Sequence, residues 1–172
     1  KLDNEINIDG FSWNTADTGV DFLGNYLDTL TAEFGRTLFV AGHETTTHLL
    51  GNGMLALLNS ETQMKKIQEN PDLIPKAVDE MARFDGSVPR SWRITKKAME
   101  ISGIHIPDGE LVLPILSSAN RDENEFLNPD VFDSSRDSRK HLAFGRGVHV
   151  CLGAPLARIE GQEIVKQLLS KF

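Results

Sequence analysis

The stretch HLAFGRGVHVCLGAPLAR, residues 141–158, contains the only cysteine of the chain, Cys151. Two glycines precede this cysteine and a third follows it, and a run with the spacing of an amphipathic helix begins after them. A cysteine just before a helix has its thiolate favoured by the helix dipole and by free backbone N–H groups. The glycines permit turns and close approach of the backbone to a flat partner. These features suit a thiolate metal ligand, and the alternative is a buried structural cysteine.

The composition outside this stretch is that of a globular domain without disulfides. The chain has 172 residues, of which 40% are hydrophobic and 25% charged, enough for one core. A single cysteine cannot form an internal disulfide, which predicts a reducing, cytoplasmic location. The net charge of −7 argues against nucleic-acid binding, and the apolar runs are too short to span a bilayer. We therefore expect a soluble protein with neither a nucleic-acid partner nor a membrane contact.

Hydrophobic periodicity predicts a mainly α chain with a small β component. The polar composition of residues 1–20 predicts a loose N-terminal segment, which is followed by residues 21–172. A long helical pattern runs from about residue 20 to residue 58, with an interruption near AGHETTT, where Gly42 and three threonines disfavour a regular helix. The remaining predicted elements are helices over 61–69, 72–84 and 152–171, short antiparallel strands within 90–116, and an irregular polar meander over 120–140.

The spacing around the cysteine resembles the haem-binding loop of the cytochrome P450 family. The matching positions read Phe144-Gly145-x-Gly147-x-His149-x-Cys151-Leu152-Gly153. This resemblance implies haem b as the cofactor, with Cys151 as the axial thiolate ligand of its iron. It also implies that His149 meets a haem propionate, that Phe144 packs beside the ligand, and that Gly153 belongs to the cofactor-binding loop.

A second motif, AGHETTT at residues 41–47, resembles the oxygen-activation segment of the same family. An acid followed by an alcohol, here Glu44 and Thr45, can relay protons to bound dioxygen, and a locally opened helix would leave room for it. These two residues are the predicted catalytic residues. Taken alone, the segment also fits a threonine that is hydrogen-bonded to its own helix.

Two more motifs follow in the order expected of the family. EMAR supplies Glu80 and Arg83, three residues apart on one helical face, as in the E-x-x-R pair. FDSSR places Arg136 where the family has the arginine that joins this pair, and the resemblance implies a structural triad that holds the meander. VPRSWRIT resembles the segment that passes the haem edge, where Arg93 matches a propionate-binding arginine.

The resemblance covers only the C-terminal half of the cytochrome P450 fold. The parts with a counterpart are the long central helix, the E-x-x-R helix, the short antiparallel strands, the meander, the cysteine-ligand loop and the last helix. The N-terminal half, which roofs the substrate pocket, has no counterpart, so apolar faces are expected to be exposed. Ser87 stands where relatives often carry proline, which predicts a looser chain path after the E-x-x-R helix.

The leading interpretation is a haem-thiolate monooxygenase. Such an enzyme inserts one oxygen atom of O2 into a small hydrophobic organic substrate, with electrons from a redox partner. Basic residues near the cysteine loop predict docking of an acidic ferredoxin-type donor near Arg139, Lys140 and Arg146, and the alternative is a solvated loop. A peroxide-using variant fits less well, since such relatives generally lack the acid–alcohol pair of Glu44 and Thr45.

Two other classes of protein compete with this interpretation. A truncated or partial chain with the same motifs would bind haem weakly and would not be catalytic by itself. A zinc hydrolase is suggested by HETTTH, but zincins need H-E-x-x-H, with histidines four residues apart on one helical face. His43 and His48 are five residues apart and diverge by roughly 140° around a helix.

Overall fold

The computed structural model describes the backbone of residues 5–8, 11–14 and 22–171, with side chains from residue 27 onward. The chain divides into two compact units, Lys1–Ala41 and Gly42–Phe172. The predicted class, mainly helical with short antiparallel strands, is confirmed. The division expected from the sequence, into residues 1–20 and 21–172, is a different one and stays a prediction.

The smaller unit contains a pair of strands that the sequence analysis placed in a loop. Strands β1 (Glu5–Ile8) and β2 (Phe11–Asn14) are antiparallel, with the first residue of β1 opposite the last residue of β2. The loop prediction is therefore wrong for these residues. The missed signal is that EINI and FSWN alternate apolar and polar residues on either side of Asp9-Gly10, which is a hairpin pattern.

The longest helix, α1, runs without a break from Phe22 to Leu58. The predicted interruption and local opening at AGHETTT are therefore wrong. The hydroxyl of Thr47 donates to the backbone carbonyl of His43 at 2.8 Å, so this side chain is satisfied within the helix. Gly42 costs about 1 kcal/mol relative to alanine inside a helix, which is too little to end one of this length.

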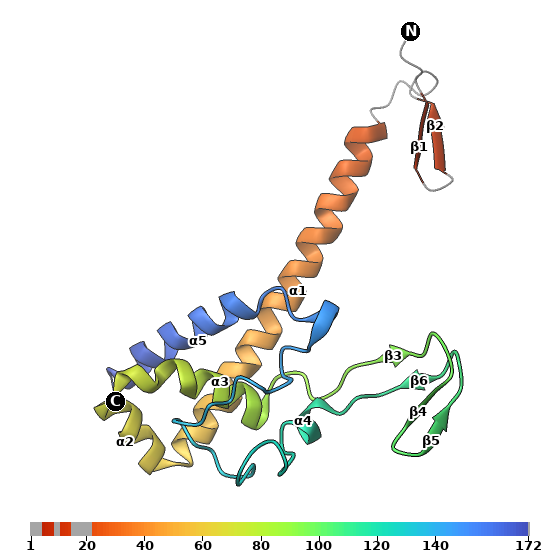
Figure 1. Ribbon diagram of the computed structural model, residues 1–172. Helices are drawn as coiled ribbons and strands as arrows, with labels where there is room; N and C mark the ends of the chain where they lie inside the picture. The colour runs from red at the N-terminus through yellow and green to blue at the C-terminus, as the bar shows by residue number, and fades with distance from the viewer. Residues whose placement is uncertain (1–4, 9–10, 15–21, 172) are drawn as a thin grey trace. The chain divides into compact units, whose positions relative to one another are not determined.

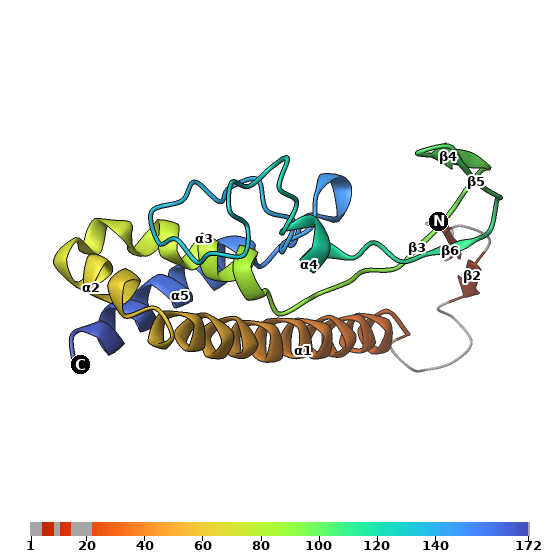
Figure 2. The same ribbon diagram turned by 90° about the horizontal axis from the view of Figure 1, so that it is seen from below.

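The larger unit also contains three helices of nine residues or more, α2, α3 and α5 (Figure 1). Helix α2 (Glu61–Glu69) has the predicted bounds, and a 3-10 turn (Pro71–Leu73) leads from it into α3 (Ile74–Asp85). Helix α5 (Ala154–Leu169) contacts α3 and lies beside it in both Figure 1 and Figure 2. It begins later than predicted because Gly153 precedes its first turn, which contains a proline.

The hydrophobic core of the larger unit surrounds α3. A Cβ atom at Gly161 of α5 would lie 2.9 Å from Val78, and one at Gly53 of α1 would lie 2.5 Å from Met81. Glycine at these two positions therefore allows both helices to approach α3 closely. The buried apolar side chains of this core are Leu49, Leu57, Ile67, Ile74, Ala77, Val78, Met81, Ala82, Phe132 and Val165.

Two short antiparallel strand pairs follow α3, as predicted. Strand β3 (Arg93–Ile94) pairs with β6 (Leu111–Val112), and β4 (Met99–Ile101) pairs with β5 (Ile104–Ile106). Helix α4 (Leu116–Ala119) comes next and was not predicted, because four residues are too few to show a helical period.

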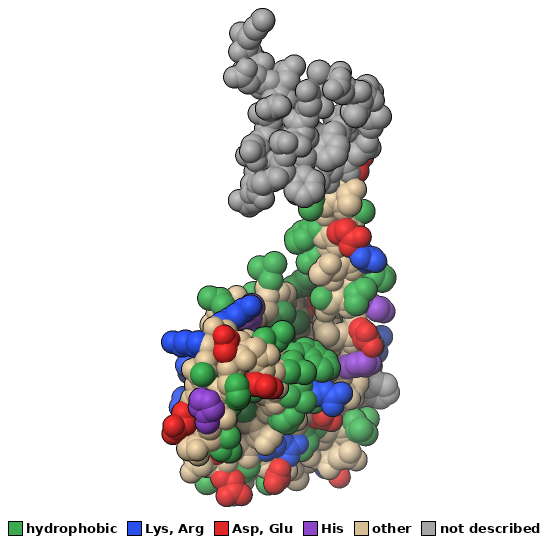
Figure 3. Space-filling view, turned by 90° about the vertical axis from the view of Figure 1, so that its right-hand side faces the viewer, with side chains coloured by type: hydrophobic (Ala, Val, Ile, Leu, Met, Phe, Trp, Pro, Cys, Tyr) green, Lys and Arg blue, Asp and Glu red, His purple; other side chains and the backbone are tan. Residues whose placement is uncertain are grey.

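Between α4 and the cysteine loop the described chain is irregular, as predicted for the meander. Apolar side chains also remain exposed, as expected. In the cysteine loop, Val148 is 96% exposed and Leu152 is 83% exposed. Figure 3 views the side on which β4 and β5 lie in Figure 1, and shows hydrophobic side chains at the surface among charged ones. No helix in the described part of the chain combines the length and apolarity needed to cross a membrane.

Candidate functional site

The residues from Phe144 to Gly153 form a tight loop ahead of α5. The backbone N–H of Cys151 donates to the carbonyl of Phe144 at 2.8 Å, which brings the two ends of the loop together. Gly145 has φ +70°, and a Cβ atom there would lie 3.0 Å from the carbonyl oxygen of His149. A side chain at this position would therefore strain the loop. The result is an exposed Cys151 just before the N-terminal end of α5.

The donor set at Cys151 fits haem better than it fits a bare metal ion. Among the residues that the structure describes, no group of three or more His, Cys, Asp or Glu could hold a metal ion. The zinc alternative at His43 and His48 therefore has no ligand set there. A single protein thiolate is a sufficient ligand for haem iron, because the macrocycle supplies other ligands of the metal. The exposed apolar side chains of Val150 and Leu152 flank the cysteine in sequence and suit a flat apolar ring.

The two residues expected at the haem propionates, Arg93 and His149, are both exposed. His149 ends a 3-10 turn (Gly147–His149) two residues before the cysteine. Arg93 begins β3, and its Nη1 donates to the hydroxyl of Ser91 and to the carbonyl of Trp92, each at 2.7 Å. A propionate would have to replace these local hydrogen bonds of Arg93. The propionate role of both residues stays a prediction.

The predicted acid–alcohol pair lies in the continuous part of α1. Glu44 is exposed and Thr45 is half-buried. The hydroxyl of Ser87 donates to the backbone carbonyl of Thr45, so the segment after α3 is tied to α1 at this pair. The looser chain path expected at Ser87 is therefore replaced by a direct hydrogen bond. Proton transfer by Glu44 and Thr45 stays a prediction.

Glu80 of α3 is fully buried and lies at the centre of a polar network. Arg83 donates to both of its carboxylate oxygens, from Nε at 2.7 Å and from Nη2 at 2.8 Å. Glu80 also accepts hydrogen bonds from Arg136 Nε at 3.1 Å, the Ser138 hydroxyl at 2.5 Å and the Asp133 N–H at 3.0 Å. Burial by itself would raise the pKa of Glu80, but hydrogen bonds led by that from Arg83 lower it below its ordinary value.

This network extends to Leu142, two residues before the cysteine loop, through a residue to which sequence analysis gave no role. Arg83 Nη1 donates to the backbone carbonyl of Asn120 at 2.8 Å, and the side chain of Asn120 accepts the N–H of Leu142 at 2.7 Å. Asn120 is only 2% exposed. Its place in the sequence, between a short helix and the polar meander, gave no signal of this role. The structure thus brings Glu80, Arg83 and Arg136 together, and Asn120 links Arg83 of this group to Leu142.

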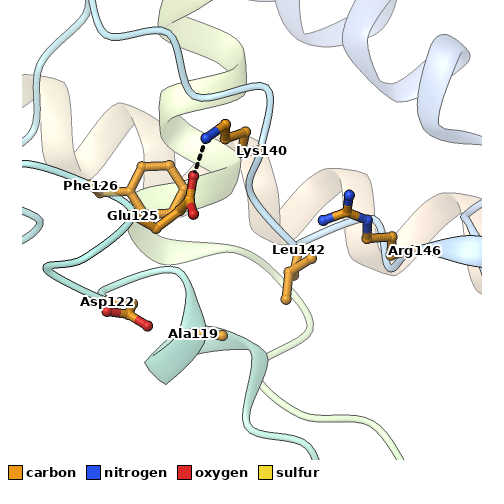
Figure 4. A pocket seen from close by; sticks show the side chains of 7 residues that line it. All are labelled: Ala119, Asp122, Glu125, Phe126, Lys140, Leu142 and Arg146. Atoms are coloured by element: carbon orange, nitrogen blue, oxygen red, sulfur yellow. Dashed lines mark hydrogen bonds and ion pairs between the residues drawn. The ribbon is translucent and has the colours of Figure 1, made fainter.

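The predicted basic face is partly neutralised by acidic neighbours. Arg139 pairs with Asp137 at 2.6 Å, and the hydrogen bonds from Arg139 lower the pKa of Asp137 to about 2. Lys140 pairs with Glu125 at 2.5 Å. A pocket of about 450 Å³ opens beside this second pair (Figure 4), lined by Ala119, Asp122, Glu125, Phe126, Lys140, Leu142 and Arg146. Of the three predicted docking cations, Arg146 alone has no ion pair to another described residue.

Comparison with known proteins decides the family. The cytochrome P450 family model matches residues 27–172. The chain belongs to the cytochrome P450 family. Family membership implies a haem cofactor with a cysteine thiolate ligand, and Cys151 is the only cysteine here.

Individual cytochromes P450 from bacteria match the same part of the chain. The biotin biosynthesis cytochrome P450 of Bacillus subtilis is 45% identical over 135 residues, which cover 78% of this chain and 34% of that protein. The vitamin D(3) 25-hydroxylase of Pseudonocardia autotrophica is 46% identical over 134 residues, 77% of this chain and 33% of that protein. This chain therefore spans about a third of the length of these curated relatives.

Solved cytochrome P450 structures agree with the fold. The crystal structure of CYP109B1 from Bacillus subtilis has a TM-score of 0.78 and 44% identity, covering 81% of this chain and 38% of that one. The structure of P450BioI in complex with an acyl carrier protein carrying hexadec-9Z-enoic acid has a TM-score of 0.76 and 46% identity, covering 78% of this chain and 35% of that one.

Proposed function

We propose that this chain is the haem-binding part of a monooxygenase, with Cys151 as the axial thiolate ligand of haem b. The observation that carries the proposal is an exposed Cys151 in a tight glycine-containing loop, in a chain of the cytochrome P450 family. When bound, haem supplies dioxygen binding and transfer of one oxygen atom to an organic substrate. The similarity to a vitamin D(3) 25-hydroxylase and to the cytochrome P450 monooxygenase PikC supports this reaction class.

The residues of the loop would hold the thiolate in place. The hydrogen bond from Cys151 N–H to the Phe144 carbonyl sets the position of the cysteine backbone. Cys151 lies just ahead of Gly153, the residue that precedes the first turn of α5. Arg93 and His149 are exposed side chains able to donate hydrogen bonds to anionic propionates.

The acid–alcohol pair would deliver protons. Because Glu44 is exposed, its carboxylate can exchange protons with water. The half-buried hydroxyl of Thr45, the next residue, would orient a water molecule or pass a proton on. The hydrogen bond from Ser87 to the Thr45 carbonyl supports a fixed backbone at this point.

We propose a small hydrophobic organic substrate and an acidic ferredoxin-type electron donor, in a cytoplasmic protein. Arg146 is exposed, and no ion pair to another described residue neutralises it, so it is the strongest candidate of the predicted face for attracting an acidic donor. Arg139 and Lys140 would first have to exchange Asp137 and Glu125 for the donor's acids.

A second candidate function is a chain that binds haem weakly and is not catalytic by itself. The observation that favours it is that the chain spans about a third of the length of its curated relatives. The two candidates share Cys151 and differ in whether the described residues hold haem firmly.

The absorption spectrum of the haem-loaded chain, reduced and exposed to carbon monoxide, tests the proposal. A strongly red-shifted Soret band is expected for the wild type, and an ordinary haem–CO band for Cys151→Ser. The far-ultraviolet circular dichroism of both proteins checks that the substitution leaves the helices intact. A red-shifted band that persists in Cys151→Ser would refute the ligand assignment, and little bound haem in the wild type would favour the second candidate.

A further inference from the structure

A second carboxylate of α3, Asp79, joins three segments that are far apart in the sequence. Its Oδ1 accepts a hydrogen bond from Nε of Arg158 in α5 at 2.7 Å. The same oxygen lies 3.5 Å from Nε2 of His141, at the start of the cysteine stretch. The side chains of Asp79 and His141 are 16% and 1% exposed. One partly buried carboxylate therefore contacts both the last helix and the segment that leads into the loop.

The hydrogen bonds of His141 define which ring nitrogen faces Asp79 as a donor. Nδ1 accepts the backbone N–H of Ala143 at 3.1 Å. A ring nitrogen that accepts carries no proton, so the network assigns the proton to Nε2, which faces the carboxylate. His141 thus connects Asp79 to the backbone of the residue before Phe144.

Phe144 contacts both partners of Asp79. Its ring centroid is 5.5 Å from that of His141 and 4.6 Å from the guanidinium carbon of Arg158. The guanidinium therefore contacts the aromatic ring while donating to Asp79. The carbonyl of Phe144 accepts the N–H of Cys151 at 2.8 Å. A continuous series of contacts leads from Asp79 to the cysteine backbone.

We propose that Asp79 is a positioning residue that fixes the loop of Cys151 through Arg158, His141 and Phe144. The relevance to haem rests on the proposed function, whereas the effect on the loop does not. This cluster shares no residue with the network of Glu80, which holds the meander directly through Arg136, Ser138 and Asp133 and reaches Leu142 only through Arg83 and Asn120. Glu80 thus contacts the meander directly, whereas Asp79 contacts the cysteine stretch and α5 directly.

The expected effect of losing the Asp79 charge is local. Replacement by asparagine keeps the shape but removes the charge-assisted hydrogen bond from Arg158. Arg158 is 33% exposed, so its guanidinium can turn toward water and leave the ring of Phe144. The loop would then open more often, while the meander would still be held by Glu80.

Amide hydrogen exchange of the 172-residue chain without haem tests the proposal directly. Asp79→Asn is expected to speed exchange in peptides covering residues 141–152 about tenfold, the effect of one lost hydrogen bond. Peptides covering residues 131–138 are expected to keep the wild-type rate. Asp79→Glu, which restores the charge, should return part of the protection. Asp137→Asn removes a carboxylate from a surface arginine pair and should change nothing in residues 141–152.

Arg158→Gln removes the hydrogen bond between Arg158 and Asp79 from the side of α5. Its exchange rates in residues 141–152 test the proposal if Asp79→Asn does not fold. Unchanged exchange in residues 141–152, or equal acceleration in both sets of peptides, would overturn the proposal. With haem added, Asp79→Asn should lower the share of the red-shifted CO band relative to the wild type, and an equal share would also overturn it. If the wild type binds no haem, the proposed function fails, and the exchange rates alone decide the role of Asp79.

Discussion

The hydroxyl of Ser87 donates a hydrogen bond to the backbone carbonyl of Thr45, across 42 positions of sequence. A proline at position 87 could not make this contact, because it has no hydroxyl. The bond ties the segment that follows α3 to the part of α1 that carries the predicted acid–alcohol pair.

Ser87→Ala is therefore expected to lower the free energy of unfolding by about 0.5–1.5 kcal/mol, since it removes one partly buried hydrogen bond. Urea unfolding followed by circular dichroism measures this change. Ser117→Ala is the matched control, because its hydroxyl donates to the Pro89 carbonyl over a longer 3.4 Å at an exposed position. Equal destabilisation by the two substitutions would contradict a specific role of Ser87.

Glu80→Gln is expected to be far more destabilising, by about 3–5 kcal/mol, because it leaves the cation of Arg83 buried without its counter-charge. Both side chains of this pair are 0% exposed. Glu61→Gln, in an exposed pair with Lys65, should cost little and serves as the control. Denaturant unfolding of the two variants compares them, and similar midpoints would show that burial of the Glu80 pair is energetically unimportant.

The stability of the chain should fall in acid. Burial alone would raise the pKa of Glu80 and that of Asp79, but hydrogen bonds, chiefly from Arg83 to Glu80 and from His141 and Arg158 to Asp79, lower both pKa values in the folded chain. The unfolded chain therefore takes up protons first as the pH falls, so the stabilisation is present above the ordinary values of 4.5 and 3.8 and is lost below them.

Measurement of the unfolding free energy between about pH 7 and about pH 3 checks this sign, because carboxyl groups titrate within that range. Asp79→Asn should flatten the acid part of the curve. A wild-type free energy that stays constant through that range would contradict the assigned direction of the pKa shifts.

Thr45→Ala should uncouple electron consumption from product formation in a haem-loaded form that turns over, with hydrogen peroxide released instead. The reason is that the Thr45 hydroxyl is the group proposed to hold the transferred proton. Thr47→Ala is the matched control on the same helix, because Thr47 is exposed whereas Thr45 is half-buried. Tight coupling in Thr45→Ala, or equal uncoupling in both variants, would count against the relay.

Arg146→Gln should slow reduction by an acidic ferredoxin more than Lys140→Gln does, because Lys140 is already paired with Glu125. The difference should shrink at high salt, where charge interactions at the surface are screened. Stopped-flow reduction at low and high ionic strength measures both effects. A larger loss in Lys140→Gln would place the docking surface elsewhere.

The elements that the sequence predicted well are those set by neighbours along the chain. The bounds of α2 follow from a proline that ends the helical region after Glu69, and the antiparallel strands follow from alternation between turn residues. The predictions failed where a local signal was weak or was overruled. Helix α4 is too short for a period, and α1 continues through its threonines because a hydroxyl such as that of Thr47 bonds within the helix.

The sequence by itself determined the mainly helical class, the family resemblance and the presence of a single cysteine in a glycine-containing loop. These follow from residue types and short spacings, which act over a few positions. Only the tertiary structure decided that Asn120 links Arg83 to Leu142 and that Asp79 holds Arg158 and His141, both of which contact Phe144. The hydrogen bonds among these contacts join residues 22 to 79 positions apart, so they exist only once the helices have packed and brought those side chains within hydrogen-bond distance.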